Sequence, residues 1–343
     1  MKKFLDNKNI LITGGTGSFG KQFIETVLKK FKPKKLVIYS RDEQKQFQLQ
    51  LKWKESDASP IRYFIGDVRD LDRLKFAMQE VDIVIHAAAL KHVPMAEYNP
   101  FEAVKTNILG AQNVIDATIA NDVKKVIALS TDKASSPINL YGATKLTSDK
   151  LFVAANNYKG SKKIKFSVVR YGNVMGSRGS VIPLFLKMKK NNIFPITDKK
   201  MTRFNITLEE SVNFVLFCLN KMWGGEIFVP KIPSYKIIDF AQAISTKAKL
   251  KFVGIRAGEK LHEEMISQHD SINTIEYNKY FVIAPNSKFI NWDKKKYMKH
   301  NKGGKNCPNY FSYNSERNKK FLKISELKKL INKNTNPKIK PKF

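Results

Sequence analysis

Tyr141 and Lys145 are the residues of this chain whose types and spacing most directly suggest chemistry. Four positions separate them, so on a helix they lie on one face and the ammonium can sit beside the phenol. A free tyrosine ionises near pH ~10, and a nearby cation favours the phenolate, which makes the pair a candidate base for hydride chemistry on an alcohol. Taken alone, the spacing also fits an amphipathic helix on which the two residues stand by chance.

A glycine-rich turn near the N-terminus gives this pair a nucleotide-binding context. The apolar run at residues 10–13 breaks into GGTGSFG at residues 14–20, and apolar residues at helical spacing follow. Strand, glycine turn and helix in this order form a dinucleotide fingerprint, because glycines let the backbone approach a pyrophosphate that the helix N-terminus attracts. The predicted cofactor-binding residues of this turn are Gly14, Thr16, Gly17, Ser18, Phe19 and Gly20.

The end of the next predicted strand, at residues 35–39, indicates which dinucleotide binds. In NAD-binding folds an acidic residue about twenty positions after the glycines usually bonds the ribose 2′-hydroxyl. Here Ser40 and Arg41 come first, and a hydroxyl with a guanidinium suits a 2′-phosphate. We therefore predict NADP, bound through Ser40 and Arg41, and Asp42 leaves NAD possible.

Strand-like and helix-like segments continue to alternate, with further apolar runs at residues 61–65, 81–85 and 125–129. Five such repeats predict an α/β fold with a doubly wound parallel sheet, whose ligands bind at the carboxyl ends of the strands. Asp67 follows one strand and is predicted to bond the adenine amine. His86 ends another, and we interpret it as a hydrogen-bonded structural residue. The remaining predicted cofactor residues are Val68, Ala87, Ala88, Ala89, Asn107, Tyr141 and Lys145.

Composition excludes several classes of protein. The 343 residues are 42% hydrophobic, which fits a globular enzyme and not a disordered chain. No window approaches 18 consecutive apolar residues, and Asp6 and Lys8 interrupt the start where a signal peptide needs an apolar stretch. Cys218 and Cys307 are the only cysteines, so neither a disulfide framework nor a metal site is expected. We predict a cytoplasmic protein without a membrane partner.

The formal net charge of +32 raises the question of a nucleic-acid partner. The lysines are scattered through every segment, and no helix-turn-helix, zinc-finger or RNP-like pattern accompanies them. A lysine-rich surface is the simpler interpretation, and we predict no nucleic-acid binding. Residues 331–343 are basic and interrupted by prolines, and they are expected to form a disordered tail.

A set of motifs resembles a known family. The chain resembles the extended short-chain dehydrogenase/reductases and, more narrowly, the inverting UDP-N-acetylglucosamine 4,6-dehydratases that start pseudaminic acid synthesis. The motifs, in chain order, are GGTGSFG, SRDE, HAAALKHVP, NPFEAVKTN, STDK, PINLYGATK, RYGNVMGSRGSVIP, MTRF and RAGEKLHEEM. The match covers roughly residues 8–330. The related capsular 5-inverting dehydratases usually carry methionine in place of the tyrosine, so Tyr141 favours the pseudaminic branch.

The resemblance implies a dehydration that starts with oxidation at C4 of the sugar. Tyr141 would be the base for the C4 hydroxyl, with Lys145 lowering its pKa, and Thr131 would hold the same hydroxyl. Lys133 would take the C5 proton and Asp132 would protonate the leaving C6 oxygen, although this division of roles stays open. A lysine base must be neutral, and we expect burial and positive neighbours to lower the pKa of Lys133. The alternative for Asp132 and Lys133 is a surface ion pair.

The resemblance also implies a substrate site for UDP-N-acetylglucosamine after the sixth strand. Asn173 is placed to bond the sugar or the diphosphate, and residues 176–180 would form a mobile turn that closes on the nucleotide. Each of the charged residues in this set also fits a structural salt bridge. The predicted substrate-binding residues are Lys91, Asn173, Arg178, Thr202, Arg203, Arg256 and Glu259.

We expect two interleaved regions. Residues 1–172 would form the NADP-binding Rossmann domain, to which residues 204–229 return. Residues 173–203 and 230–330 would form a smaller α/β substrate region. The resemblance further implies a homo-oligomer.

Two rival functions use the same fold. A nucleotide-sugar 4-epimerase or C4 reductase would need Tyr141 and Lys145 but has no use for Asp132 and Lys133. A non-catalytic nucleotide-sensing or nucleic-acid-binding protein would not need Thr131, Tyr141 and Lys145 together.

Overall fold

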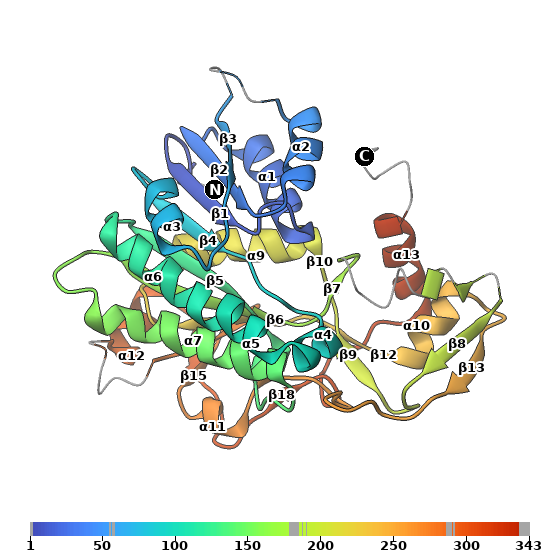
Figure 1. The fold of residues 1–343 in the computed structure, drawn as a ribbon. Helices are drawn as coiled ribbons and strands as arrows, with labels where there is room; N and C mark the ends of the chain where they lie inside the picture. The colour runs from blue at the N-terminus through green and yellow to red at the C-terminus, as the bar shows by residue number, and fades with distance from the viewer. Residues whose placement is uncertain are drawn as a thin grey trace.

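A ten-stranded sheet forms the centre of the described molecule (Figure 1). The structure is a computed structural model, and it describes residues 3–54, 56, 59–177, 185–186, 188–189, 191–285, 290 and 292–335. The strands of the sheet are β1 (Asn9–Thr13), β2 (Lys35–Ser40), β3 (Ile61–Ile65), β4 (Ile83–His86), β5 (Lys125–Thr131), β6 (Lys165–Tyr171), β11 (Ile227–Pro230), β15 (Thr274–Glu276), β16 (Tyr280–Ile283) and β17 (Lys305–Asn306). Their order is β17-β15-β16-β11-β6-β5-β4-β1-β2-β3.

The strands from β3 to β11 run parallel, and β16, β15 and β17 add antiparallel pairs at one end. The inner parallel strands are mostly apolar because helices cover both faces of the sheet. In β1 all five residues are buried. Ile10 and Ile12 belong to the hydrophobic cluster on one face, whereas Leu11 belongs to the cluster on the other.

Helices cover the two faces in separate groups. The longer ones are α1 (Ser18–Lys30), α2 (Glu43–Lys52), α3 (Leu71–Ala77), α6 (Gly110–Ala120), α7 (Leu140–Tyr158), α9 (Leu208–Lys221) and α12 (Lys294–His300). Apolar residues of α1, α9 and α12 share one cluster, and those of α3, α6 and α7 share the other. The predicted doubly wound α/β fold is confirmed.

Short elements connect these helices and strands. They are α4 (Val93–Tyr98), α5 (Pro100–Val104), the π-helical η1 (Lys105–Leu109), the 3₁₀ turn η2 (Asp132–Ala134) and α11 (Gln268–Ser271). Since η2 begins where β5 ends, it places Asp132 and Lys133 at the carboxyl edge of the parallel sheet.

A smaller region lies beside the sheet, at the right of Figure 1. It contains the strand pairs β8 (Ile193–Ile196) with β13 (Lys249–Phe252) and β9 (Thr202–Phe204) with β12 (Ser234–Lys236), and the helices α10 (Ile237–Ile244) and α13 (Ile324–Thr335). A third hydrophobic cluster fills it. The pairs β7 (Val174–Met175) with β10 (Ile206–Thr207) and β14 (Glu264–Ile266) with β18 (Tyr313–Asn314) lie where the chain passes between the regions.

Two predicted boundaries differ from the structure. Residues 274–276, 280–283 and 305–306 fall in the predicted substrate region, but they are strands of the central sheet because β16 pairs with β11. Residues 331–335, predicted as disordered tail, continue α13 because Leu327 and Ile331 are buried in the third cluster. Residues 336–343 lie outside the described residues. The returning segment does pack on the first domain, where α9 contacts α1 and β5.

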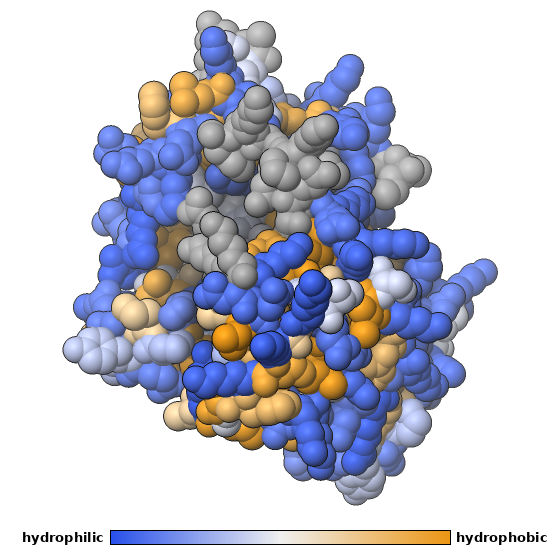
Figure 2. All heavy atoms as spheres, turned by 90° about the vertical axis from the view of Figure 1, so that its right-hand side faces the viewer, coloured by the Kyte–Doolittle hydropathy of each residue, from blue (hydrophilic) through white to orange (hydrophobic). Residues whose placement is uncertain are grey.

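The surface is mostly hydrophilic on the face that carries the smaller region (Figure 2). Apolar patches interrupt it, and Ile193, Phe252 and Val253 of the β8–β13 pair and its continuation are exposed apolar residues. Among the described residues no helix has the length and apolar character needed to span a bilayer.

A buried carboxyl group marks the junction of α9 and β11. Glu226 is fully buried, and its Oε1 accepts a hydrogen bond of 2.6 Å from the backbone N–H of Trp223. Burial raises the pKa of this carboxyl to about 7, although backbone N–H groups around it act in the opposite direction.

We predict that Glu226→Gln removes the part of the pH dependence of stability that this carboxyl causes. The unfolded carboxyl ionises near pH ~4.3, so from there to about pH 7 only the folded state keeps the proton, and parent stability falls as pH rises. Relative to the parent, Glu226→Gln should therefore gain roughly 3 kcal/mol between pH 5 and pH 8. Denaturant unfolding at both pH values measures this change. Glu25→Gln, at an exposed position, is the control; an equal change in both variants would contradict the prediction.

Candidate active site

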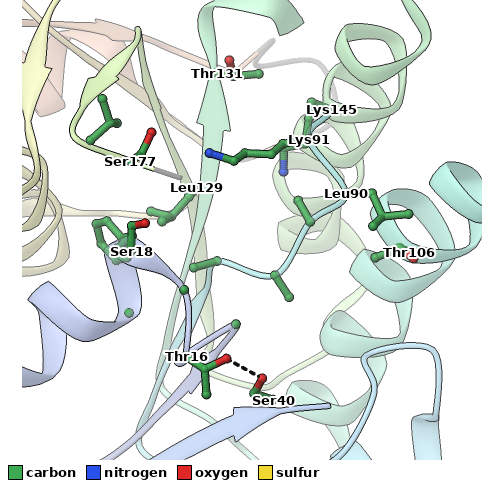
Figure 3. Close-up of a pocket in the computed structure, with 18 of the residues that line it drawn as sticks. Thr16, Ser18, Ser40, Leu90, Lys91, Thr106, Leu129, Thr131, Lys145 and Ser177 are labelled. Carbon is green, nitrogen blue, oxygen red and sulfur yellow. Dashed lines mark hydrogen bonds between the residues drawn. The ribbon is translucent and has the colours of Figure 1, made fainter. Parts of the chain in front are cut away.

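A cavity of about 770 Å³ opens at the carboxyl ends of the parallel strands. Its walls come from the glycine turn after β1, from the ends of β2, β4, β5 and β6, and from the first turns of α7. Figure 3 shows Thr16 and Ser40 at one end of this cavity, and Lys91, Thr131 and Lys145 at the other. Every predicted cofactor-binding residue lines the cavity except Asn107.

Gly14 and Gly20 of the glycine turn leave no room for a side chain. Gly14 has φ +66°, and a Cβ there would lie 2.9 Å from the backbone nitrogen of Ala88. A Cβ on Gly20 would lie 2.2 Å from the carbonyl oxygen of Gly15. The backbone therefore folds tightly onto the start of α1, whose N-terminal N–H groups face the cavity and suit a pyrophosphate. These features fit a dinucleotide.

Hydroxyl and guanidinium groups lie together where the adenosine ribose would bind. The side chains of Thr16 and Ser40 are hydrogen-bonded at 2.8 Å (Figure 3). Arg41 forms an ion pair of 3.5 Å with Asp67, which also accepts a 2.8 Å bond from Arg69. Burial acts to raise the pKa of Asp67, but the arginines outweigh it and the net pKa is lowered. The carboxylate of Asp42 instead caps α2 and pairs with Lys45.

Asn107 lies behind the cavity wall. Its amide accepts a 2.8 Å bond from the N–H of Leu90 and donates bonds to the Leu90 carbonyl and the Thr144 hydroxyl. It therefore fixes the loop after β4, which carries Ala87–Ala89 and Lys91. His86 is buried and bonded through Nδ1 to Thr13 at 2.9 Å, so its interpretation as a structural residue is confirmed.

The start of α7 packs directly on the loop after β5. Asn139 caps the helix, and its Oδ1 accepts a 2.8 Å bond from Gly142 N–H. A Cβ on Gly142 would lie 2.2 Å from the carbonyl oxygen of Lys133, so only glycine allows this approach. Tyr141 and Lys145 of α7 consequently line the same cavity as Lys133.

Asp132 and Lys133 form an ion pair at the cavity wall, with Asp132 buried and Lys133 partly exposed to the cavity, and not a pair on the outer surface. Asp132 is 1% exposed, and its Oδ1 accepts bonds from the Thr131 hydroxyl at 2.9 Å and from Lys133 Nζ at 3.1 Å. Lys133 Nζ also lies 3.1 Å from Oε1 of Glu263.

The prediction of a lowered pKa for Lys133 is wrong. Burial does act to lower its pKa, but the carboxylates of Asp132 and Glu263 outweigh burial and hold it well above its usual value. Burial raises the pKa of Asp132, and the ammonium of Lys133 offsets only part of this shift. The two carboxylates thus favour a proton on Lys133, and the raised pKa of Asp132 makes its carboxylate easier to protonate than an exposed one.

Tyr141 also differs from expectation. Burial raises its pKa to about 12, and the largest opposing effect is the charge of Lys133, not that of Lys145. A hydrogen bond with Thr131 also acts to lower it. Burial lowers the pKa of Lys145, and Asp149 on the same helix opposes this.

Of the predicted substrate residues that the structure describes, two line the cavity and four do not. Lys91 and Asn173 line the cavity. Arg178 lies outside the described residues. Thr202 is buried and bonds His262 and Ser315, and it does not line the cavity.

Arg203 holds the segment that follows Arg256. It donates bonds to the carbonyls of Lys260 and Leu261 and pairs with Glu259 at 3.5 Å. Arg256 is exposed and bonds Glu259 at 3.0 Å. These contacts position the segment 256–263 next to the η2 turn, where Glu263 meets Lys133 and Lys260 bonds the carbonyl of Ser135.

Glu263 is the residue that sequence reasoning missed. It stands in the motif RAGEKLHEEM, but neither its spacing nor its neighbours indicated that its carboxylate would meet Lys133. Among the described residues no group of three or more His, Cys, Asp or Glu side chains is arranged to hold a metal ion.

Comparison with known proteins agrees with this geometry. Residues 10–285 match the family described as polysaccharide biosynthesis protein. The chain is 56% identical over 330 residues to a Campylobacter jejuni protein named UDP-N-acetylglucosamine 4,6-dehydratase (inverting), covering 95% of this chain and 98% of that one. The chain belongs to the polysaccharide biosynthesis protein family. A Rickettsia bellii protein named UDP-glucose 4-epimerase is 41% identical over 336 residues, covering 96% of each chain.

Two solved structures are similar to this chain. The X-ray structure of Pen from Bacillus thuringiensis matches with a TM-score of 0.86 and 40% identity, covering 96% of this chain and 98% of that one. DesIV, a dTDP-glucose 4,6-dehydratase from Streptomyces venezuelae solved with NAD and TYD bound, matches with a TM-score of 0.65 and 22% identity, covering 74% and 86%. The similarity to DesIV bears on the fold of this chain alone.

We predict that Gly142→Ala disrupts the site. The added methyl group meets the carbonyl of Lys133, so either α7 or the η2 turn must move. We expect turnover to fall by at least about tenfold, since displacing a catalytic group by ~1 Å is costly. Thr147→Ala, at an exposed position of the same helix, is the control and should retain parent turnover. Parent-like kinetics in Gly142→Ala would show that this contact does not fix the site.

Proposed function

We propose that this protein is a UDP-N-acetylglucosamine 4,6-dehydratase that inverts C5 of the sugar. Its product would be UDP-2-acetamido-2,6-dideoxy-β-L-arabino-hex-4-ulose. The observation that carries the proposal is the meeting of Thr131, Asp132, Lys133 and Tyr141 at one wall of the nucleotide cavity. The 56% identity to the Campylobacter enzyme named for this reaction supports the same substrate.

The proposed cofactor is NADP. The glycine turn would hold its pyrophosphate, Ser40 and Arg41 its 2′-phosphate, and Lys145 its nicotinamide ribose. When bound, a nicotinamide dinucleotide accepts hydride from C4 and returns it at C6, so the reaction has no net redox change. The C4 ketone makes C5 an α-carbon, which allows its proton to leave.

Tyr141 is the proposed base for the C4 hydroxyl. Thr131, which is hydrogen-bonded to Tyr141, would hold the same hydroxyl. With a pKa of about 12, the phenol is protonated at neutral pH, so it must lose its proton before it accepts another. The charge of Lys133 stabilises the phenolate form, and Tyr141 then takes the hydroxyl proton as hydride leaves C4.

Asp132 and Lys133 would carry out the elimination. Lys133 Nζ donates to Asp132 Oδ1 at 3.1 Å, and transfer of that proton leaves a neutral amine beside a neutral acid. The amine then takes the C5 proton, and the acid gives its proton to the C6 oxygen, which departs as water. Afterwards Lys133 is again an ammonium and Asp132 a carboxylate. As hydride returns to C6, C5 would take one solvent-derived proton on the face opposite Lys133, which completes the product and inverts this carbon. Burial raises the pKa of Asp132 and acts to lower that of Lys133, and both effects favour the uncharged pair, against the carboxylates that hold the proton on Lys133.

The alternative function is a nucleotide-sugar 4-epimerase, and the Rickettsia relatives named UDP-glucose 4-epimerase support it. An epimerase returns hydride to C4 and needs no acid–base pair for C5 and C6. A buried Asp132–Lys133 pair at the cavity wall favours the dehydratase. We further propose that the protein acts in the cytoplasm, as a homo-oligomer, at the start of pseudaminic acid-type glycan synthesis.

We predict that purified parent protein removes one water from UDP-N-acetylglucosamine, and that Tyr141→Phe lowers kcat by about 10²- to 10⁴-fold. The phenyl ring preserves the packing but cannot accept the C4 hydroxyl proton. Mass spectrometry of the nucleotide sugar measures the loss of water. Tyr310→Phe, at an exposed position, should keep parent activity. Formation of an isomer without loss of water would favour an epimerase and overturn the proposal.

We predict that Arg41→Ala weakens NADP binding by about tenfold or more and leaves NAD binding unchanged, because the lost bond is to the 2′-phosphate. Titration of each dinucleotide into the protein gives the two affinities. Arg69→Ala removes a neighbouring arginine that also pairs with Asp67, and it should affect both dinucleotides alike. A parent protein that binds NAD at least as tightly as NADP would contradict the assignment.

A further inference from the structure

Glu263 is a buried carboxylate that faces the catalytic loop from the smaller region of the fold. Its side chain is 3% exposed, and its Oε1 lies 3.1 Å from Lys133 Nζ and 3.6 Å from Arg203 Nε. The other oxygen, Oε2, is buried and has no hydrogen-bond partner. Lys133 is therefore held between two carboxylates, Asp132 on its own turn and Glu263 on the opposite segment.

The backbone around Glu263 is fixed from two sides. Its N–H donates to the Ser315 hydroxyl at 2.9 Å, and its carbonyl accepts from Ser315 N–H at 2.7 Å. The neighbouring carboxylate of Glu264 accepts a bond of 2.9 Å from Ser136. Lys260 Nζ donates to the carbonyl of Ser135 at 2.6 Å. These contacts tie the segment to the residues that follow Lys133, so the position of the Glu263 carboxylate is well defined.

We propose that Glu263 is a positioning residue, whose carboxylate holds the Lys133 amine against Asp132 and sets the pH range in which this pair carries one transferable proton. The second part rests on the proposed dehydratase function, whereas the first does not. A fixed amine matters because proton transfer from a carbon requires the base within hydrogen-bond reach of that proton.

Other charged groups around Lys133 do not replace Glu263. Arg203 on β9 and Lys91 on the loop after β4 are cations and act against a second positive charge. The remaining titratable groups that face it are Tyr141 on α7, Tyr235 on β12 and Lys260. Asp132 and Glu263 are thus the two anions that hold the proton on Lys133, and Glu263 also acts to raise the pKa of Asp132.

The sign of the effect follows from this arrangement. A negative charge at Glu263 raises the pKa of both members of the Asp132–Lys133 pair. Glu263→Gln keeps the size of the side chain and removes the charge, so both pKa values fall. The pair then loses its transferable proton at a lower pH than in the parent.

The first experiment tests the charge at Lys133 without any substrate. Acetic anhydride acylates only neutral amines, and Lys133 borders an open cavity with a quarter of its side chain exposed. At a fixed alkaline pH, peptide mass spectrometry should find Lys133 largely unlabelled in the parent and labelled in Glu263→Gln, with the exposed lysines as internal standards. The half-labelling pH should fall by about 1–3 units.

Two further variants separate charge from structure. Glu264→Gln removes the same charge one residue away, where the carboxylate bonds serines and not Lys133, and should label like the parent. Glu263→Asp keeps the charge and should restore protection of Lys133. Equal labelling of Lys133 in the parent and Glu263→Gln would overturn the proposal, as would protection lost equally in Glu264→Gln.

The second experiment measures kcat against pH with UDP-N-acetylglucosamine. Glu263→Gln should lower kcat at neutral pH by at least about tenfold and displace the whole profile to lower pH, while Glu263→Asp keeps the parent profile. A lower kcat with an unchanged profile would mean that Glu263 only supports the fold. If the parent lacks dehydratase activity, the proposed function fails, and the labelling result still decides the role of Glu263.

Discussion

The ammonium of Lys133 between two buried carboxylates is the interaction on which the rest of the site depends. Asp132 supplies one carboxylate from the adjacent position, and Glu263 supplies the other from a segment 130 residues later in the chain. Burying three charged groups together is costly unless each is paired, so this cluster constrains how the smaller region can dock on the sheet. Its contacts join the end of β5 to the start of β14.

The sheet explains why this cluster meets a nucleotide cavity. Parallel strands end at one edge, so the glycine turn, the loop after β4 and the η2 turn converge there. The close contact of Gly142 with the Lys133 carbonyl then brings α7 to the same point and places Tyr141 beside Thr131. The residues proposed to bind the cofactor and to transfer protons therefore share a wall, although their sequence positions are far apart.

Local patterns in the sequence were sufficient to predict the dinucleotide-binding half of the fold. The glycine turn needs only consecutive residues, and the Tyr141–Lys145 spacing is a property of one helix, so neither depends on distant packing. The inner parallel strands were readable because they are mostly apolar and are buried on both faces, as in β1, β2 and β4. Asn107 was placed in the right region, but its side chain points to the backbone of Leu90, a direction that no pattern encodes.

The substrate half was less predictable because its contacts are long-range. Nothing near Glu263 in the sequence indicates a partner at Lys133, and the same holds for Arg203 and the carbonyls of Lys260 and Leu261. The pKa of Lys133 was predicted in the wrong direction because the prediction weighed burial and positive neighbours alone. The carboxylates of Asp132 and, second, Glu263 outweigh both. The short antiparallel strands β15 and β17 have two or three residues each, too few to show a period.

The most direct test of this account is NMR of the sugar product formed from UDP-N-acetylglucosamine in heavy water. If Lys133 exchanges the C5 proton while the hydride removed from C4 returns to C6, the product first formed carries one deuterium at C5 and a fully protonated C6 methyl group. Deuterium in the C6 methyl group, or a C5 position that keeps its original proton, would contradict the mechanism.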